Sequence, residues 1–257
     1  MRLTSRVAKA LSGKTAIVTA STDGIGFAIA KRLAQDGAKV WISSRKQENV
    51  DSALEELRGM DLDVDGMVCH VGNRDHRHEL IETVMEKDKS LNILVSNAAV
   101  NPFFGSILDT PEASWDKIFE INVKNAFQLI QECVPHLAQN EMSNITTIAS
   151  IAGYQPMPML GAYSVSKTAL ISLSKVLAME LADEGIRVNT VCPGVVKTKF
   201  AGAIVEMEDQ VSQQFALKRF AVPDEMSGIV AFLSDDERAS YVTGESYTVS
   251  GGGNFRL

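Results

Sequence analysis

The feature that most constrains the fold is a regular alternation of short apolar runs with longer amphipathic stretches along the 257 residues. The runs are apolar almost throughout rather than at every second position, which is typical of strands buried on both faces. The stretches between them have apolar residues at helical spacing. This alternation predicts a parallel sheet covered by helices on both faces. We expect its strands at 15–20, 39–44, 63–71, 91–99, 144–152, 186–194 and 245–253.

The predicted helices lie between these strands, and one of them has marked ends. Thr110 suits an N-cap and Pro111 the first helical position, whereas Pro135 should kink or shorten the far end of that helix. Residues 195–221 have no regular pattern, and Pro223 is expected to open another helix. The other helices are expected at 26–37, 47–59, 74–88 and 161–184.

No linker, repeat or low-complexity block divides the chain. The sequence therefore predicts a single α/β domain over residues 1–257, of the Rossmann-type doubly wound class, with about seven parallel strands. Its nucleotide-binding half would be about 13–110, and its catalytic and substrate-binding half about 111–257.

Charge and cysteine usage narrow the possible partners. A formal net charge of −7 argues against nucleic acid or an anionic membrane as the main partner. No apolar run approaches the roughly 20 residues that a membrane span needs. Cys69, Cys133 and Cys192 are isolated, so we expect buried thiols in a reducing compartment and no metal site.

The stretch "VTASTDGIGFAIA" at 18–30 follows the first predicted strand. In such a fold this turn presents helix N–H groups to a pyrophosphate, although a lone Gly-x-Gly also fits a plain helix-opening turn. Because alanine in the left-handed region costs roughly 1–2 kcal/mol, we expect a negative φ at Ala20. The residues expected to approach the phosphates are Ser21, Thr22, Asp23, Gly24, Ile25 and Gly26.

The end of the second strand indicates which nicotinamide cofactor is used. NAD sites place Asp or Glu about 20 residues beyond the glycine turn, but this chain has Ser44, Arg45 and Lys46 there. A hydroxyl and cations can bind and neutralise a 2′-phosphate. We therefore predict NADPH/NADP⁺, the alternative being two solvated cations at the start of a surface helix.

The strongest signal for catalysis lies in "ASIAGYQPMPMLGAYSVSKTAL". Tyr163 and Lys167 are four residues apart on a predicted helix, so they share one face. Ser150 ends a strand upstream, and Asn122 lies in the preceding helix. A Tyr-x-x-x-Lys pair alone is also common as a surface pair. It indicates catalysis here because Ser150 and Asn122 occur with it.

With Thr19, Asn97-Ala98-Ala99 and Pro193-Gly194…Thr198, these residues resemble the short-chain dehydrogenase/reductase family over nearly the whole chain. The segments "TASTDGIGFAIA", "VCHVG" and "LVSNAAVNPFFG" look closest to a branch of peroxisomal, tetrameric NADPH-dependent carbonyl/retinal reductases. The resemblance implies hydride transfer from NADPH to ketones or aldehydes, and a homotetramer.

The resemblance also implies a role for each catalytic residue. Tyr163 would give a proton to the carbonyl oxygen, and Lys167 would lower the pKa of Tyr163 and hold the nicotinamide ribose. Ser150 would polarise the carbonyl group, and Asn122 would anchor a water-linked proton relay. Further cofactor contacts are implied for His70, Val71, Asn97, Ala98, Pro193, Val196 and Thr198, besides Tyr163 and Lys167. His70 departs from the family, where an acidic residue commonly meets the adenine.

The expected substrate pocket is apolar, which favours α-dicarbonyls, aromatic ketones and retinal over sugars. Its candidate lining is Phe103, Phe104, Tyr154, Met157, Met159, Leu160, Phe200 and Phe215. An NAD(P)-dependent alcohol, steroid or retinol dehydrogenase working oxidatively remains the alternative. An enoyl reductase and a non-catalytic nucleotide sensor are disfavoured, because those relatives commonly change the Tyr/Lys pair.

The chain ends Phe255-Arg256-Leu257, which resembles an S-K-L-type peroxisomal address except for the bulky first residue. We expect a peroxisomal location first and the cytosol second.

Overall fold

The computed structural model describes residues 9–253, which form a seven-stranded parallel sheet of order β3-β2-β1-β4-β5-β6-β7. This confirms the predicted fold class, and every predicted strand is present, although most are shorter than expected. The strands are β1 (Thr15–Val18), β2 (Lys39–Ser44), β3 (Val64–Val68), β4 (Ile93–Ser96), β5 (Ser143–Ile148), β6 (Ile186–Pro193) and β7 (Ser246–Val249).

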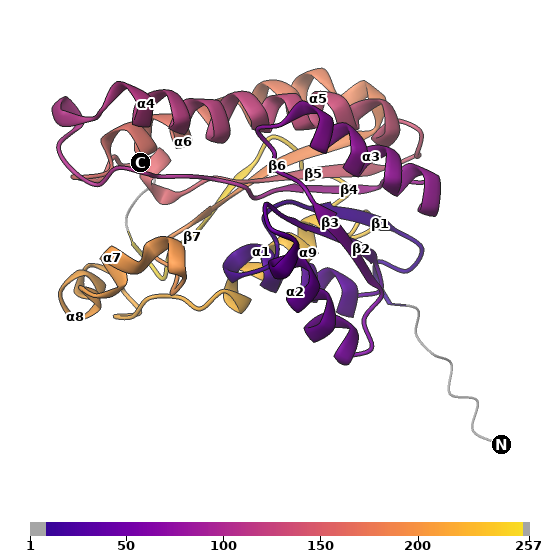
Figure 1. Ribbon diagram of the computed structural model, residues 1–257, viewed down its shortest axis with the longest axis horizontal. Helices are drawn as coiled ribbons and strands as arrows, with labels where there is room; N and C mark the ends of the chain where they lie inside the picture. The colour runs from indigo at the N-terminus through magenta and orange to yellow at the C-terminus, as the bar shows by residue number, and fades with distance from the viewer. Residues whose placement is uncertain (1–8, 254–257) are drawn as a thin grey trace.

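Helices cover both faces of the sheet (Figure 1). On one face lie α1 (Gly24–Gln35), α2 (Gln47–Gly59) and α9 (Asp224–Ser234); on the other lie α3 (Arg74–Asp88), α4 (Glu112–Phe119), α5 (Asn125–Leu137) and α6 (Gly161–Glu180). Each face has its own apolar core because successive strand residues point to opposite sides. In β1, Val18 packs toward α1 and Ile17 toward α3 and α5, and both are fully buried.

The strand order reverses between β1 and β4. The chain runs outward from β1 through β2 to β3, and then returns to place β4 on the other side of β1. The loops that follow β1 and β4 therefore diverge at the carboxyl edge, where doubly wound sheets bind their ligands. The candidate site is built at this edge.

One predicted helix boundary needs correction. Pro111 is the N-cap of α4 rather than its first residue, and Thr110 closes a short 3₁₀ turn, Ile107–Asp109. Pro135 lies inside α5, which ends two residues later at Leu137, so its effect is confined to the last turn. The main irregularity is instead a π-helical turn, Glu120–Lys124, between α4 and α5.

The irregular stretch 195–221 folds into short pieces rather than one element. It contains α7 (Gly202–Val205), α8 (Glu208–Val211) and the 3₁₀ turns Lys199–Ala201 and Ser212–Gln214. Figure 1 shows α7 and α8, in orange, at one end of the molecule. Among residues 9–253, no helix combines the length and the apolar character that crossing a membrane requires.

Candidate active site

Thr19 ties together the ends of the two strands that flank the switch point. Its Oγ1 accepts hydrogen bonds from the backbone N–H groups of Asn97 (3.0 Å) and Ala98 (3.3 Å). The Asn97 side chain in turn donates from Nδ2 to the carbonyl oxygens of Thr19 and Ala20, both at 3.0 Å. These bonds fix the glycine turn against the loop after β4.

Ala20 has a φ of +50°, so the expectation of a negative φ was wrong. The reason is tertiary hydrogen bonding on both sides of this residue. The Ala20 carbonyl accepts from Asn97 Nδ2, and the next backbone N–H, that of Ser21, donates to the Ser43 carbonyl at 2.9 Å. Satisfying both partners forces the left-handed conformation on a residue that would otherwise avoid it.

Ser21 does not point toward a ligand. Its hydroxyl is fully buried, donates to the Val18 carbonyl at 2.5 Å and accepts from the Ser43 N–H at 3.0 Å. The side chain therefore joins β1 to β2, and the placement of Ser21 toward the phosphates needs correction. Thr22 beside it is half-buried.

The start of α1 leaves room for a ligand at its backbone. Asp23 is the N-cap, and its Oδ1 accepts from the Gly24 N–H at 2.7 Å. A Cβ on Gly26 would lie 2.4 Å from the Ala20 carbonyl oxygen, so only glycine fits there without a backbone shift. A Cβ on Gly24 would lie 3.2 Å from Thr198 Cγ2 and would need a positive φ of +56°. Both positions thus fit the close approach of a dinucleotide pyrophosphate.

A cavity of about 500 Å³ runs along this edge of the sheet. Its size is within the range of small-molecule sites. Twelve of the predicted site residues line it: Asp23, Gly24, Ile25, Gly26, Arg45, Asn97, Ser150, Tyr163, Lys167, Pro193, Val196 and Thr198. Of the predicted substrate-pocket residues, Phe104, Met157, Leu160 and Phe200 line it as well.

The other predicted residues lie outside the lining of this cavity. On the cofactor side they are Ser21, Thr22, Ser44, Lys46, His70, Val71 and Ala98; on the substrate side they are Phe103, Tyr154, Met159 and Phe215. Phe215 is instead buried in a small core with Ile151 and Phe220. Asn122 also lies behind the cavity wall, and its contacts are described below.

Arg45 and His70 flank the nucleotide end of the sheet. Arg45 is exposed at the end of β2 and lines the cavity, whereas Lys46 beside it pairs with Glu48 at 3.2 Å. His70 follows β3, and its Nδ1 accepts from the Gly72 N–H at 2.9 Å, which assigns the ring proton of the neutral form to Nε2. Burial, helped by the nearby cations Lys117 and Arg45, lowers the pKa of His70.

Tyr163 and Lys167 lie together on the first turns of α6 and line the cavity. Both are buried, and Lys167 Nζ lies 5.6 Å from the centroid of the Tyr163 ring. Lys167 Nζ also donates to the Ile148 carbonyl at 2.8 Å. Burial lowers the pKa of Lys167 to about 8. Burial raises the pKa of Tyr163 above its usual value and a hydrogen bond with Ser150 opposes that rise, so the expected lowering of this pKa by Lys167 was wrong: burial outweighs it.

Asn122 acts on the site through a chain of hydrogen bonds. From the π-helical turn it exchanges two bonds with the Val100 backbone, at 2.8 and 3.0 Å, and donates to Ser166 Oγ at 3.1 Å. Ser166 Oγ donates to the Tyr163 carbonyl at 2.7 Å. Asn122 therefore fastens the loop after β4 to the helix that carries Tyr163 and Lys167. No pattern in the sequence singles out Ser166, which is one of several serines in α6.

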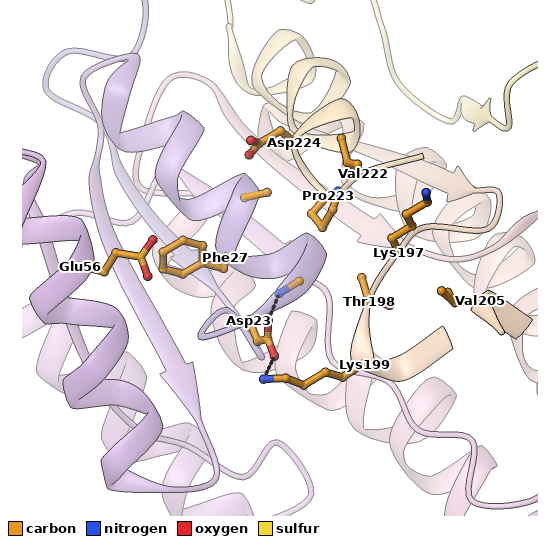
Figure 2. A pocket seen from close by; sticks show the side chains of 12 residues that line it. Asp23, Phe27, Glu56, Lys197, Thr198, Lys199, Val205, Val222, Pro223 and Asp224 are labelled. Carbon is orange, nitrogen blue, oxygen red and sulfur yellow. Dashed lines mark hydrogen bonds and ion pairs between the residues drawn. The ribbon is translucent and has the colours of Figure 1, made fainter. Parts of the chain in front are cut away.

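A second feature that the sequence did not reveal is an ion pair at the rim of the cavity. Lys199 Nζ lies 2.7 Å from Asp23 Oδ2, and Figure 2 shows the lysine reaching from the 195–221 stretch to the start of α1. The hydrogen bond from Lys199 holds the pKa of Asp23 below its usual value. Asp23 belongs to the glycine turn, but Lys199 is far from it in the chain and belongs to no recognisable motif.

The three cysteines are all buried. Within residues 9–253, no group of three or more His, Cys, Asp and Glu side chains is placed to hold a metal ion.

Comparison with known proteins defines the class of this protein. A family profile described as enoyl-(acyl carrier protein) reductase matches residues 19–254. The chain belongs to the short-chain dehydrogenase/reductase family, whose members are oxidoreductases that use NAD(P)(H).

Individual relatives span nearly the whole chain. Dehydrogenase/reductase SDR family member 4 from Bos taurus is 50% identical over 245 residues, covering 94% of this chain and 88% of the relative. Tropinone reductase-like 3 from Erythroxylum coca is 47% identical over 254 residues, covering 98% and 97%. The structure of a short-chain type dehydrogenase/reductase from Mycobacterium marinum superposes with a TM-score of 0.89 at 27% identity, covering 95% of this chain and 96% of the other.

Proposed function

We propose that this oxidoreductase is an NADPH-dependent carbonyl reductase that acts on small apolar ketones and aldehydes. The observation that carries the proposal is the set of residues that line one cavity. Tyr163, Lys167 and Ser150 line it beside apolar side chains, while Arg45 and the glycine turn line it as well. The 50% sequence identity to dehydrogenase/reductase SDR family member 4 from Bos taurus supports the same assignment.

NADPH, when bound, supplies the hydride for the reduction. Tyr163 gives the proton, because a phenol whose pKa is raised by burial stays protonated until the carbonyl oxygen gains charge. Ser150 donates a hydrogen bond to that oxygen. The Lys167 ammonium, charged below about pH 8, stabilises the phenolate that proton transfer leaves behind. Asn122 positions these groups through Ser166 and holds the water-linked relay to Lys167.

The residues that would hold NADPH follow from the lining of the cavity. Gly24, Ile25 and Gly26 with Asp23 lie at the pyrophosphate, and Arg45, with Ser44 and Lys46 beside it, binds the 2′-phosphate. Asn97, Pro193, Val196 and Thr198 face the nicotinamide end, together with Tyr163 and Lys167. His70, Val71 and Ala98 are proposed only as supports of the adenine and ribose positions.

The apolar wall supports α-dicarbonyls, aromatic ketones and possible retinoid-sized aldehydes as substrates. Phe104, Met157, Leu160 and Phe200 form that wall near Tyr163. The same Tyr–Lys–Ser set runs alcohol oxidation in reverse, so an oxidative dehydrogenase of alcohols, steroids or retinol is the second candidate.

A panel of substrates tests the proposal. Purified protein is assayed with aromatic ketones, diketones, retinal and the matching alcohols, and with crotonyl-CoA as an enoyl substrate, each with NADP(H) and NAD(H). Carbonyl reduction that is faster with NADPH is expected. Alcohol oxidation alone, or activity only toward crotonyl-CoA, would contradict the assignment. Arg45→Glu should weaken the binding of NADPH far more than that of NADH, because it replaces a cationic partner of the 2′-phosphate with a negative charge that repels it.

The assembly and location are part of the proposal as well. The resemblance supports one domain in a homotetramer, which sedimentation tests; a stable monomer would count against it. Phe255-Arg256-Leu257 lies outside the described residues, and a reporter carrying the last dozen residues tests peroxisomal import. A diffuse signal would contradict import and indicate the cytosol instead.

A further inference from the structure

Three consecutive residues of the irregular 195–221 stretch each contact a different part of the proposed site. The Thr198 methyl group packs over Gly24, and Lys199 pairs with Asp23. The Phe200 ring lies 5.9 Å, centroid to centroid, from the ring of Tyr163. Lys199 is the only charged member of the three. Lys199 therefore links the nucleotide turn to the 195–221 stretch, which also contributes Phe200 to the substrate end of the cavity.

The charge of Asp23 creates a problem at this position. Asp23 begins α1, where the helix N–H groups favour an anion, but its own carboxylate already caps the helix through the Gly24 N–H. A second anion that approaches the same turn meets an exposed carboxylate of like charge. Lys199 lies 2.7 Å from the oxygen that does not cap the helix, so its charge offsets that of Asp23 there.

Stability of the fold does not account for the pair. The side chains are 90% and 59% exposed, and surface ion pairs of this kind add little to the free energy of folding. Lys197, two residues earlier, makes an equally short pair with Glu208 at 2.8 Å within its own segment. The two pairs differ in location, because Lys199 lines the nucleotide cavity and Lys197 does not.

Lys199 and Asp23 also separate two cavities. Both residues, with Gly24 and Thr198, line the nucleotide cavity and a second, more open cavity of about 670 Å³ between α1 and the start of α9. Figure 2 shows this second cavity, with the dashed ion pair at its edge. The pair thus forms a charged rim across the position where the pyrophosphate would lie.

We propose that Lys199 is a positioning residue for the cofactor: it neutralises Asp23 and so lets the dinucleotide pyrophosphate bind at the turn. The inference rests on the proposed function, since it needs a nicotinamide dinucleotide in this cavity. It differs from the role of Arg45, because the pyrophosphate is common to NADPH and NADH. Loss of Lys199 therefore weakens the binding of both cofactors by the same factor.

A double-mutant cycle read by equilibrium titration of NADPH and NADH fluorescence tests this role without turnover. Lys199→Ala should raise both dissociation constants about fivefold, the scale of one partly screened charge contact. Asp23→Asn keeps a good N-cap but removes the charge. In the Asp23→Asn background, Lys199→Ala should change either constant by less than about twofold. Lys197→Ala is the matched control and should leave both constants near wild type.

The outcomes separate this inference from the function on which it rests. Binding of NADPH by the wild type with no effect of Lys199→Ala overturns the inference alone. An equal loss in both Asp23 backgrounds overturns neutralisation, because Lys199 would then act without Asp23. A loss confined to NADPH overturns the pyrophosphate placement. If the wild type binds neither NADPH nor NADH, the proposed function fails and the inference with it. Unchanged melting temperatures in all variants exclude unfolding as the cause of a loss.

Discussion

The two ends of the cavity are built in different ways. At the nucleotide end, Thr19 and Ser21 are fully buried and bond the glycine turn to β4 and β2. At the substrate end, the 195–221 stretch is anchored by a small core of its own around Phe215 and Phe220 and by surface ion pairs such as Arg219–Glu225, and it leaves Phe200 56% exposed. The nucleotide end is therefore part of the core of the sheet, whereas the substrate end has a separate, smaller core and an exposed edge at the cavity.

Because the two ends are built differently, the class of the protein follows from its sequence more readily than its substrate does. Buried hydrogen bonds between strands are costly to break, so the nucleotide turn admits few residue types. Exposed side chains on a loop, such as that of Phe200, can change at little cost to folding. The following experiments perturb one end at a time.

The largest effect is expected from Gly26→Ala at the nucleotide end. The new Cβ would lie 2.4 Å from the Ala20 carbonyl oxygen, a backbone atom fixed by Asn97. We expect a loss of about 1–3 kcal/mol of folding free energy and of detectable NADPH binding, measured by thermal denaturation and fluorescence titration. Gly228→Ala in α9 is the control, because a Cβ there meets nothing within 4 Å. Normal NADPH affinity in Gly26→Ala would refute the close-approach account.

A pH profile examines the buried pair where the two ends meet. The pKa of Lys167, lowered to about 8, means that its ammonium is present below that pH and lost above it. We expect kcat/KM for carbonyl reduction to fall by about tenfold for each pH unit above 8. Lys167→Arg, if it retains activity, should move this fall to higher pH, because arginine stays charged. A flat profile up to pH 10 would show that Lys167 is not the titrating group.

Phe200→Ala examines the substrate end. The ring lines the cavity beside Tyr163 and is more than half exposed. We expect KM for an aromatic ketone to rise by about tenfold, with NADPH affinity and melting temperature nearly unchanged. Leu217→Ala, in the same stretch but outside the cavity lining, serves as the matched control. A large drop in melting temperature would mean that the exposed Phe200 ring helps to hold the fold together.

The smallest effect is expected from Ala20→Gly. Glycine removes the strain of a φ of +50°, but it also increases the entropy of the unfolded chain. The net gain should be about 0.5 kcal/mol, or a rise of roughly 1–2 °C in melting temperature. Differential scanning calorimetry can resolve such a shift. A decrease in stability would mean that the Ala20 methyl group packs favourably enough to outweigh the strain.

The parts of the fold that the sequence predicts are those governed by local patterns. Apolar runs such as 15–20 and 39–44 became β1 and β2, and the spacing of Tyr163 and Lys167 placed both in one cavity. These features depend on period and spacing, which a sequence displays directly.

The parts that the sequence misses depend on contacts between distant segments. Ala20 takes a positive φ because Asn97 and Ser43 bond its neighbouring peptide groups, and no residue near it signals this. The hydroxyl of Ser21 is turned into the sheet for the same kind of reason. The π-helical turn at Asn122 contains neither proline nor glycine. The Lys199–Asp23 pair joins residues that are 176 positions apart and cannot be found from spacing.

Tyr163 is proposed as the proton donor of a carbonyl reductase, and Tyr163→Phe removes the proton that this role requires. The substitution removes one hydroxyl and keeps the buried ring, so folding and NADPH affinity should stay near wild type. Turnover of the best ketone of the panel, followed by the absorbance of NADPH, should fall by about 10²–10⁴-fold. Turnover within about threefold of wild type, with the protein folded and NADPH bound, would contradict the claim.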